Sequence, residues 1–164
     1  MALEIERRFL VTGDQWQAGA VAASVVQGYL STDPGRVVRV RLTGGQGFLT
    51  IKGPSAGPTR SEFEYPVPAD DAREMLTLCG DAVVEKTRWQ VRHAGDDWVV
   101  DVFAGANRGL VLAEIELPGA DHPFRLPPWV GLEVTGDHRY ANASLAVRPI
   151  TTFVDPGSKP AGGV

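Results

Sequence analysis

Hydrophobic and polar residues alternate with a period of two along most of this chain. In the opening stretch MALEIERRFLV, Glu4, Glu6 and Arg8 alternate with Ile5 and Phe9. Residues two apart lie on the same face of a β-strand, so this pattern predicts a strand with one charged face and one apolar face. The pattern recurs, and we predict strands at residues 2–11, 24–31, 36–43, 46–53, 60–66, 83–92, 97–103, 110–117 and 130–135.

Turn residues and a few helical segments separate the strands. Gly44-Gly45 and Gly95-Asp96 are typical of tight hairpin turns. A helix is predicted over residues 69–79, where apolar residues recur at helical spacing and Gly80 follows the last of them. Weaker helix candidates cover residues 14–23 and 140–146. We expect a single domain over residues 1–150 and a partly disordered tail, rich in proline and glycine, over residues 151–164.

The charges on the strand faces are sorted by strand rather than mixed. Arg39 and Arg41 share one strand, whereas Glu114 and Glu116 share another. A solvated outer face explains any single strand, but such faces usually mix charges because like neighbours repel. Sorted blocks favour strands of opposite charge that face one another across a space. About eight antiparallel strands can close into a barrel, so the pattern indicates a barrel with a charged lumen.

Such a lumen needs water or a ligand, because unpaired buried charges cost several kcal/mol each. Arginine and lysine bind phosphate oxygens, and carboxylates bind Mg²⁺ or Mn²⁺. A polyanion bound together with a divalent metal fits both charge types. The predicted inward cations are Arg8, Arg39, Arg41, Lys52, Lys86 and Arg88.

Composition excludes several other kinds of protein. The net charge of −4 provides no overall basic field, so we expect no nucleic-acid partner. The single cysteine, Cys79, excludes an internal disulfide framework and a site with several cysteine ligands. No signal-peptide pattern and no long apolar stretch is present, so we expect a cytoplasmic protein without a membrane partner. His93, His122 and His138 lack metal-ligand spacing.

Short motifs spread over nearly the whole chain resemble those of the CYTH superfamily, the triphosphate tunnel metalloenzymes. The motifs are EIERRFL at 4–10, QGYL at 27–30, RVR at 39–41, LTIKGP at 49–54, SEFEYPVP at 61–68, EKTRW at 85–89, VDVF at 100–103, LAEIEL at 112–117 and GLEVTGDHRYANASLA at 131–146. The resemblance implies an α+β fold: an eight-stranded antiparallel barrel, open as a tunnel, with a few flanking helices. The compact length is most similar to that of small bacterial inorganic triphosphatases.

The resemblance also implies roles for individual residues. Substrate phosphates would contact the six inward cations, and catalysis would use Glu4, Glu6, Arg8, Lys86 and Tyr29. The acids implied for metal binding, in which Asp101 has the least defined role, are Glu4, Glu6, Glu62, Glu64, Asp101, Glu114 and Glu116.

One position departs from the family signature, which has lysine where this chain has Arg8. A lysine can lose its proton and help to activate the attacking water, whereas arginine stays protonated. Arg8 is therefore expected to bind phosphate rather than to act as the general base. A metal-bound water, Tyr29 or a glutamate of the lumen remains as the alternative for water activation.

The function that we predict is hydrolysis of inorganic triphosphate to diphosphate and phosphate, with Mg²⁺ or Mn²⁺ as cofactor. One alternative is a class IV-type adenylate cyclase or a nucleoside or thiamine triphosphatase, for which Trp16, Trp89 or Trp129 would have to stack on a base. Another is a non-catalytic module that binds polyphosphate or a nucleotide. The expected partner is a small molecule that contains a triphosphate, and a homodimer is left open.

Overall fold

The computed structural model describes residues 2–153 and contains nine strands and two α-helices within that range. The strands are β1 (Leu3–Val11), β2 (Val21–Ser31), β3 (Val37–Thr43), β4 (Gln46–Ala56), β5 (Thr59–Val67), β6 (Val83–His93), β7 (Asp96–Phe103), β8 (Val111–Glu116) and β9 (Val130–Glu133). The helices are α1 (Ala69–Leu78) and α2 (Asn142–Val147), and the 3₁₀ turns are η1 (Gln15–Gln17), η2 (Gly105–Asn107), η3 (His138–Tyr140) and η4 (Ile150–Thr152).

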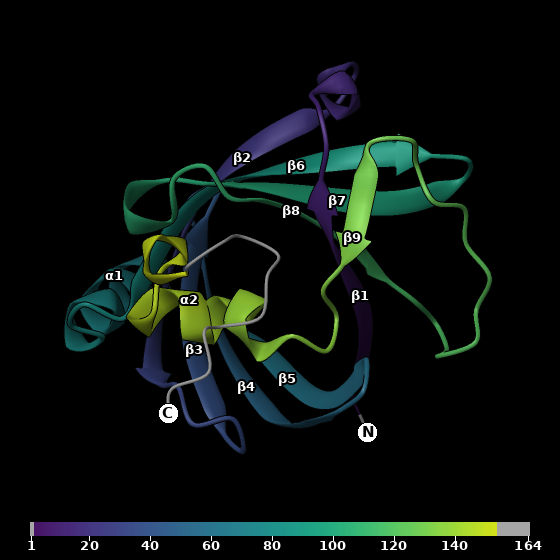
Figure 1. Ribbon diagram of the computed structural model, residues 1–164. Coiled ribbons are helices and arrows are strands. Elements are labelled where there is room, and N and C mark those ends of the chain that lie inside the picture. The colour runs from purple at the N-terminus through teal and green to yellow at the C-terminus, as the bar shows by residue number, and fades with distance from the viewer. Residues whose placement is uncertain (1, 154–164) are drawn as a thin grey trace, which may run out of the picture.

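Eight of the strands form the closed antiparallel barrel that the alternation pattern and the resemblance predicted. The strand order is β5-β4-β3-β2-β6-β7-β8-β1, and pairing of β1 with β5 closes the ring (Figure 1). That closure is short, running from Leu3 opposite Ser61 to Ile5 opposite Thr59. The ninth strand, β9, pairs with the end of β1.

The first of two hairpin turns is as the sequence predicted, whereas the second, predicted at Gly95-Asp96, lies one residue earlier because Asp96 already begins β7. Gly44 and Gly45 both have positive φ, 56° and 76°, between β3 and β4. Such angles match the right-handed twist of the strands that a two-residue turn joins. Ala94 and Gly95 play the same part between β6 and β7, with φ of 52° and 92°.

The predicted helix over residues 69–79 is present as α1. It ends where expected, because Gly80 follows Cys79 with φ of 59°. The helix covers the outer face of β3, where Val40 is fully buried against Ala72 and Cys79. The candidate over residues 140–146 corresponds to α2, which follows η3 directly.

The helix that we predicted over residues 14–23 is wrong. Only Gln15–Gln17 forms a short 3₁₀ turn, and β2 already begins at Val21. Val21 pairs with Gln90 of β6, and this strand pairing overrides the weak helical pattern. Gly19, with φ of 75°, redirects the chain between the two.

Apolar packing surrounds the barrel and also covers part of one end of it. Aromatic residues Phe9, Trp98 and Trp129 form a cluster on the outer faces of β1 and β7. A second cluster contains residues on the inward strand faces, including Leu112, which packs with Leu145 of α2. α2 and η3 therefore cover part of this end of the barrel with apolar side chains, an arrangement that the alternation pattern did not indicate.

The predicted disordered tail lies mostly outside the described residues. Its first part is ordered, because Ile150–Thr152 forms η4 and Phe153 makes an edge-to-face contact with Tyr140 at 5.6 Å between ring centroids. The proposed domain boundary at residue 150 stays a prediction. No helix within residues 2–153 is long and apolar enough to cross a membrane.

Candidate active site

The inward faces of the strands line a charged tunnel made of two adjoining cavities of about 340 Å³ and 410 Å³. Both cavities are lined by residues from β1, β3 and β4, which join them into one space. The structure brings together the predicted site residues that line one or both cavities, namely Glu4, Glu6, Arg8, Tyr29, Arg39, Arg41, Lys52, Glu62, Glu64, Lys86, Arg88, Glu114 and Glu116. Asp101 lies directly behind this lining, fully buried.

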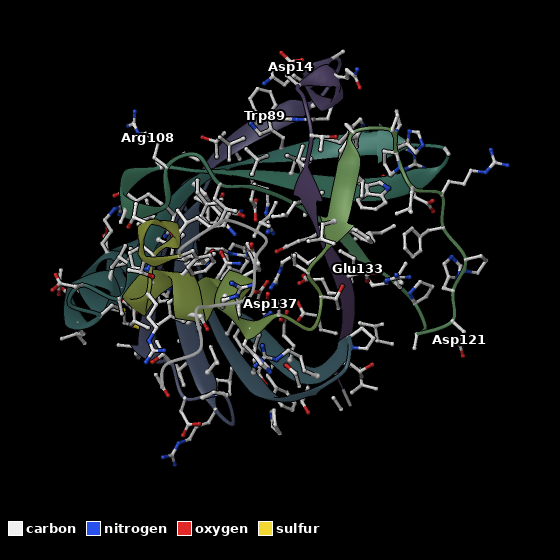
Figure 2. The ribbon with its side chains drawn as sticks, in the orientation of Figure 1. Asp14, Trp89, Arg108, Asp121, Glu133 and Asp137 are labelled. Carbon is white, nitrogen blue, oxygen red and sulfur yellow. The ribbon has the colours of Figure 1, made fainter. Side chains whose placement is uncertain are left out.

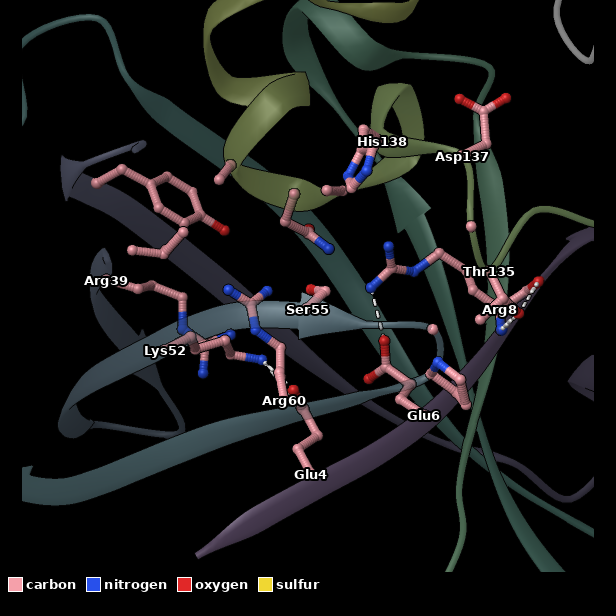
Figure 3. A pocket seen from close by; sticks show the side chains of 18 residues that line it. Glu4, Glu6, Arg8, Arg39, Lys52, Ser55, Arg60, Thr135, Asp137 and His138 are labelled. Atoms are coloured by element: carbon pink, nitrogen blue, oxygen red, sulfur yellow. Dashed lines mark hydrogen bonds and ion pairs between the residues drawn. The ribbon is translucent and has the colours of Figure 1, made fainter. Parts of the chain in front are cut away.

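The tunnel has two differently charged ends. We call the end lined by Ser55–Arg60 and Thr135–Ala143 the loop mouth; Figure 3 shows its side chains. We call the end lined by Gln90, Asp97 and Glu116 the acidic mouth. The carboxylates of Asp97 and Glu116 belong to exposed residues, so this end reaches solvent.

Lys52 links two acids near the closure of the barrel. Its Nζ lies 2.8 Å and 2.9 Å from the two carboxylate oxygens of Glu4 and 2.7 Å from Glu62. β4 supplies the lysine, β1 and β5 supply the acids, and register places Lys52 directly opposite Glu62. The short β1–β5 pairing therefore assembles this triad from three strands.

Arg8 bridges two acids of neighbouring strands. Its Nη2 donates to Glu6 at 2.6 Å and its Nε donates to Glu114 at 3.0 Å. Burial lowers the pKa of Arg8, but the two carboxylates outweigh burial and raise it above the ordinary arginine value. Arg8 thus stays charged, which agrees with its expected role in phosphate binding and not in proton transfer.

Asp101 organises two cations of β6. It accepts hydrogen bonds from Lys86 at 2.7 Å and from Arg88 at 2.7 Å through both of its oxygens. Burial lowers the pKa of Lys86 to about 8, against the opposing effect of Asp101. Lys86 also donates to Asn142 of α2 at 3.0 Å. This geometry favours Asp101 as the residue that positions these cations rather than as a metal ligand.

Arg39 and Arg41 share the carboxylate of Glu64, at 3.1 Å and 3.0 Å. Thr50 donates to the same carboxylate at 2.8 Å. The Nε atoms of both arginines are buried and have no hydrogen-bond partner among the described residues. Buried donors without acceptors are costly. Oxygen atoms of a ligand would accept hydrogen bonds from these two Nε atoms and remove that cost.

Glu4 and Glu6 have raised pKa values although each contacts a cation, Lys52 for Glu4 and Arg8 for Glu6. Burial, together with the neighbouring Glu114, raises the pKa of Glu6 to about 7 despite its contact with Arg8. Burial and the neighbouring Glu62 likewise raise the pKa of Glu4. Glu116, opposite Glu6 on β8, has no ion pair within residues 2–153. Carboxylate oxygens that repel one another in this way suit a divalent cation.

No three His, Cys, Asp or Glu side chains are gathered as a ready metal site in the described part of the chain. The carboxylates contact arginine and lysine instead, as the ion pairs above show. The donor chemistry nevertheless fits Mg²⁺ or Mn²⁺, since Glu4, Glu6 and Glu116 offer hard oxygen ligands on adjacent strands.

Tyr29 is buried and its hydroxyl accepts a hydrogen bond from Gln27 at 2.7 Å. Burial raises the pKa of Tyr29 to about 12. A phenol with this pKa is a poor general base near neutral pH, so the structure argues against Tyr29 in that role.

Sequence reasoning missed several residues at the loop mouth. Arg60, Ser55, His138 and Asn142 all line this cavity. Arg60 alternates with Glu62 on the inward face of β5, so its inward orientation was predictable from the same period of two. His138 and Asn142 begin η3 and α2, whose placement depends on tertiary packing, so the period of two gave no signal for them.

Comparison with known proteins agrees with this architecture. The model of the CYTH domain family matches residues 2–149, which is most of the chain. The chain belongs to the CYTH family. A protein of Acetivibrio thermocellus named inorganic triphosphatase is 45% identical over 154 residues, which cover 93% of this chain and 99% of that protein.

Further proteins are similar in sequence or in fold. A Nitrosomonas europaea protein, also named inorganic triphosphatase, is 36% identical over 149 residues, covering 88% of this chain and 97% of that protein. A crystal structure of an inorganic triphosphatase matches with a TM-score of 0.66 at 35% identity, over 90% of this chain and 96% of that one. A protein from Pyrococcus horikoshii matches with a TM-score of 0.55 at 19% identity, covering 72% of this chain and 81% of that one, which shows the shared fold.

Proposed function

We propose that this CYTH protein hydrolyses inorganic triphosphate to diphosphate and phosphate inside its tunnel, with Mg²⁺ or Mn²⁺ as cofactor. The observation that carries the proposal is the lumen itself. Seven arginine and lysine residues and eight carboxylates of the described part of the chain line it, from strands on all sides. Relatives named inorganic triphosphatase, one of them 45% identical along almost the entire chain, support the choice of substrate.

Substrate binding would rearrange the ion pairs that the tunnel now contains. Phosphate oxygens compete with Glu64 for Arg39 and Arg41, and they can accept bonds from the two buried Nε atoms. The same competition at Lys52 would release Glu4 from its lysine. Binding of the polyanion therefore prepares the carboxylates of β1 for a cation.

We propose that Glu4, Glu6 and Glu116 hold the metal. When bound, Mg²⁺ or Mn²⁺ neutralises phosphoryl oxygens and lowers the pKa of a coordinated water. Glu62, Glu64, Asp101 and Glu114 were also predicted as metal ligands. Their contacts with lysine and arginine support a role in orienting the cations that bind phosphate.

One cation of the tunnel, outside the proposed metal site, fits a role in accepting the proton of the attacking water. Burial lowers the pKa of Lys86 to about 8, and Lys86 lies among the phosphate-binding cations. Lys86 fits general acid–base chemistry better than Arg8 or Tyr29, whose pKa values lie far above neutral. The cations would stabilise the leaving diphosphate in place.

No observation favours the nucleotide alternatives. Trp16 and Trp129 are buried in the outer aromatic cluster, and Trp89 packs edge-to-face on Trp16 at 5.5 Å. Figure 2 shows Trp89 beside β2 at the periphery of the barrel. Tyr29, which is engaged with Gln27, and the imidazole of His138 are the aromatic rings that line the two cavities within residues 2–153. None of these three tryptophans lines either cavity.

Product analysis tests the proposal. Purified protein with Mg²⁺ or Mn²⁺ is given tripolyphosphate, ATP or thiamine triphosphate in parallel, and orthophosphate, diphosphate and cyclic AMP are measured. We expect orthophosphate and diphosphate in equal amounts, fastest from tripolyphosphate. Cyclic AMP would support the cyclase alternative, and binding without turnover would support the non-catalytic module.

Substitutions at the proposed metal site make the test specific. Glu4→Ala and Glu6→Ala should reduce turnover at least about a hundredfold, because each removes a ligand. Glu74→Ala, which removes an exposed carboxylate on α1, is the matched control and should leave turnover unchanged. Full activity in the Glu4 and Glu6 variants would show that the metal assignment is wrong.

A cytoplasmic location and a homodimer stay predictions.

A further inference from the structure

Arg60 differs from the other arginines and lysines that line the tunnel. Each of the six predicted cations lies within 4.0 Å of at least one carboxylate, whereas Arg60 has no carboxylate partner within residues 2–153. Its Nε and Nη2 donate to the backbone carbonyl of Gly53 at 3.2 Å and 2.7 Å. Its Nη1 makes no hydrogen bond to the described residues. Arg60 can therefore donate a hydrogen bond from Nη1 to a ligand, and its charge is not neutralised by a carboxylate of these residues.

The surroundings of Arg60 place that charge at the end of the substrate path. β5 holds Arg60 opposite Ser55 of β4 and opposite Glu4 of β1. The Ser55 side chain belongs to an exposed residue and makes no hydrogen bond within the described part of the chain. Figure 3 shows the Arg60 side chain reaching into the cavity between Ser55 and Lys52. A second cation and a free hydroxyl therefore extend the phosphate-binding groups from Lys52 to the loop mouth.

The charges at the two mouths indicate beside which mouth the end group of the phosphate chain lies. At the acidic mouth, Glu116 has no ion pair within residues 2–153 and repels a phosphate chain, whereas Asp97 is paired with Arg92 at 2.7 Å. At the loop mouth, Asp137 is neutralised by Arg139, whose Nη2 donates to it at 2.6 Å. The end of a polyanion is therefore more favourably placed at the loop mouth, beside Arg60.

We propose that Arg60 and Ser55 form an additional phosphate subsite at the loop mouth, and that this subsite discriminates inorganic triphosphate from triphosphate esters. The inference rests on the proposed function and adds a residue that determines its specificity. The end group of an inorganic chain presents unesterified oxygens with more charge than the esterified phosphate of a nucleotide. A guanidinium placed at this position binds the former more strongly.

A purely structural role for Arg60 has to be separated from this one. The bond to Gly53 secures the irregular part of β4, where the register shifts between Lys52 and Ser55. Arg60→Gln retains an amide donor for the Gly53 carbonyl but removes the charge. Arg60→Lys retains the charge but lacks the planar guanidinium group with its paired donors. Arg73→Gln makes the same change on the outer helix α1 and is the matched control.

Calorimetric binding in EDTA, where no turnover occurs, is the decisive experiment. Wild-type protein and the three variants are titrated with tripolyphosphate and with ATP. We expect Arg60→Gln to weaken tripolyphosphate binding about tenfold and ATP binding less than about twofold, as the loss of one charge-assisted contact predicts. Arg60→Lys should stay within about threefold of wild type for tripolyphosphate, and Arg73→Gln should match wild type for both ligands.

With metal present, Arg60→Gln should raise KM for tripolyphosphate about tenfold and leave kcat within about twofold, because a contact to the end group of the chain is made equally in the bound substrate and in the transition state. Equal loss for tripolyphosphate and ATP, or no loss for either, would overturn the subsite alone. Wild-type protein that fails to bind tripolyphosphate would instead overturn the proposed function, and the subsite with it.

Discussion

At the scale of single residues, the tunnel is stable without a ligand because its charges neutralise one another. Asp101 is fully buried, yet both of its oxygens accept bonds from cations. Burial raises the pKa of Asp101, but Lys86 and Arg88 outweigh burial and hold it below the ordinary value. A buried charge is tolerated only beside an opposite charge. Removing one partner should therefore lower the free energy of unfolding by far more than the intact pair contributes to it.

Asp101→Asn should therefore destabilise the fold. The substitution leaves Lys86 buried without a counter-charge, at a cost of about 3 kcal/mol in the free energy of unfolding. Urea denaturation measures the loss, and tripolyphosphate should restore part of it by supplying negative charge. Asp97→Asn, at an exposed position of the same strand, is the control and should change stability by less than about 0.5 kcal/mol. Equal effects of the two substitutions would contradict the buried ion-pair network.

Glu6 should make the stability of the metal-free protein depend on pH. Its pKa is raised from 4.5 to about 7 in the folded state, so the folded state binds the extra proton. This contribution is fully present below pH 4.5 and is lost as the pH rises through 7, with a total of about 3 kcal/mol.

Denaturation of the metal-free protein at pH 5 and pH 8 measures this loss, and Glu6→Gln should flatten it. The stabilisation by Mg²⁺ or Mn²⁺ should change in the opposite direction and grow from pH 6 to pH 8, because the metal needs the ionised carboxylate. Glu74→Gln should keep the wild-type profile, whereas an unchanged profile in Glu6→Gln would assign the dependence to another group.

At the scale of elements, the barrel wall and α1 fit together at glycines. A Cβ on Gly47 would lie 2.7 Å from the Cβ of Ala72 and 2.9 Å from the carbonyl oxygen of Val67. The bare backbone of β4 thus allows the helix to pack closely on the sheet. This contact lies outside the tunnel, so it affects stability rather than substrate binding.

Gly47→Ala should consequently lower the free energy of unfolding by about 2 kcal/mol, the usual cost of overpacking, and leave tripolyphosphate affinity unchanged. Urea denaturation and calorimetry on the same preparation measure the two quantities. Gly119→Ala adds the same methyl group where no atom lies within 4 Å and should be neutral. A loss of affinity in proportion to the loss of stability would show that α1 supports the site as well as the fold.

At the scale of the whole molecule, the period of two predicted the strands and the inward residues well. On every strand of the barrel, alternate side chains point into the tunnel, so the same local pattern identifies them each time. Arg39 on β3 and Glu114 on β8 line the same cavity. Apart from the alternation on each strand, nothing in the sequence indicates that these two residues lie close together. The false helix at 14–23 shows the limit of the rule, since pairing of Val21 with β6 is decided by distant residues. The alternation also gives no signal for the apolar cover at one end of the barrel, because the packing of Leu145 against Leu112 joins segments far apart in the chain.

The same distribution of charge predicts that the phosphate chain stabilises the whole barrel. Its cations come from β1, β3, β4 and β6, so one bound polyanion contacts strands around the ring and unfolding must release it. At a tripolyphosphate concentration a hundred times its Kd, the free energy of unfolding should rise by about 2.7 kcal/mol without metal. Thermal denaturation in EDTA measures the shift. Sulfate at matched ionic strength should give less than a quarter of it, because a single tetrahedral anion contacts fewer strands. An equal shift with sulfate would mean that screening of repulsion, and not a chain spanning the tunnel, stabilises the protein.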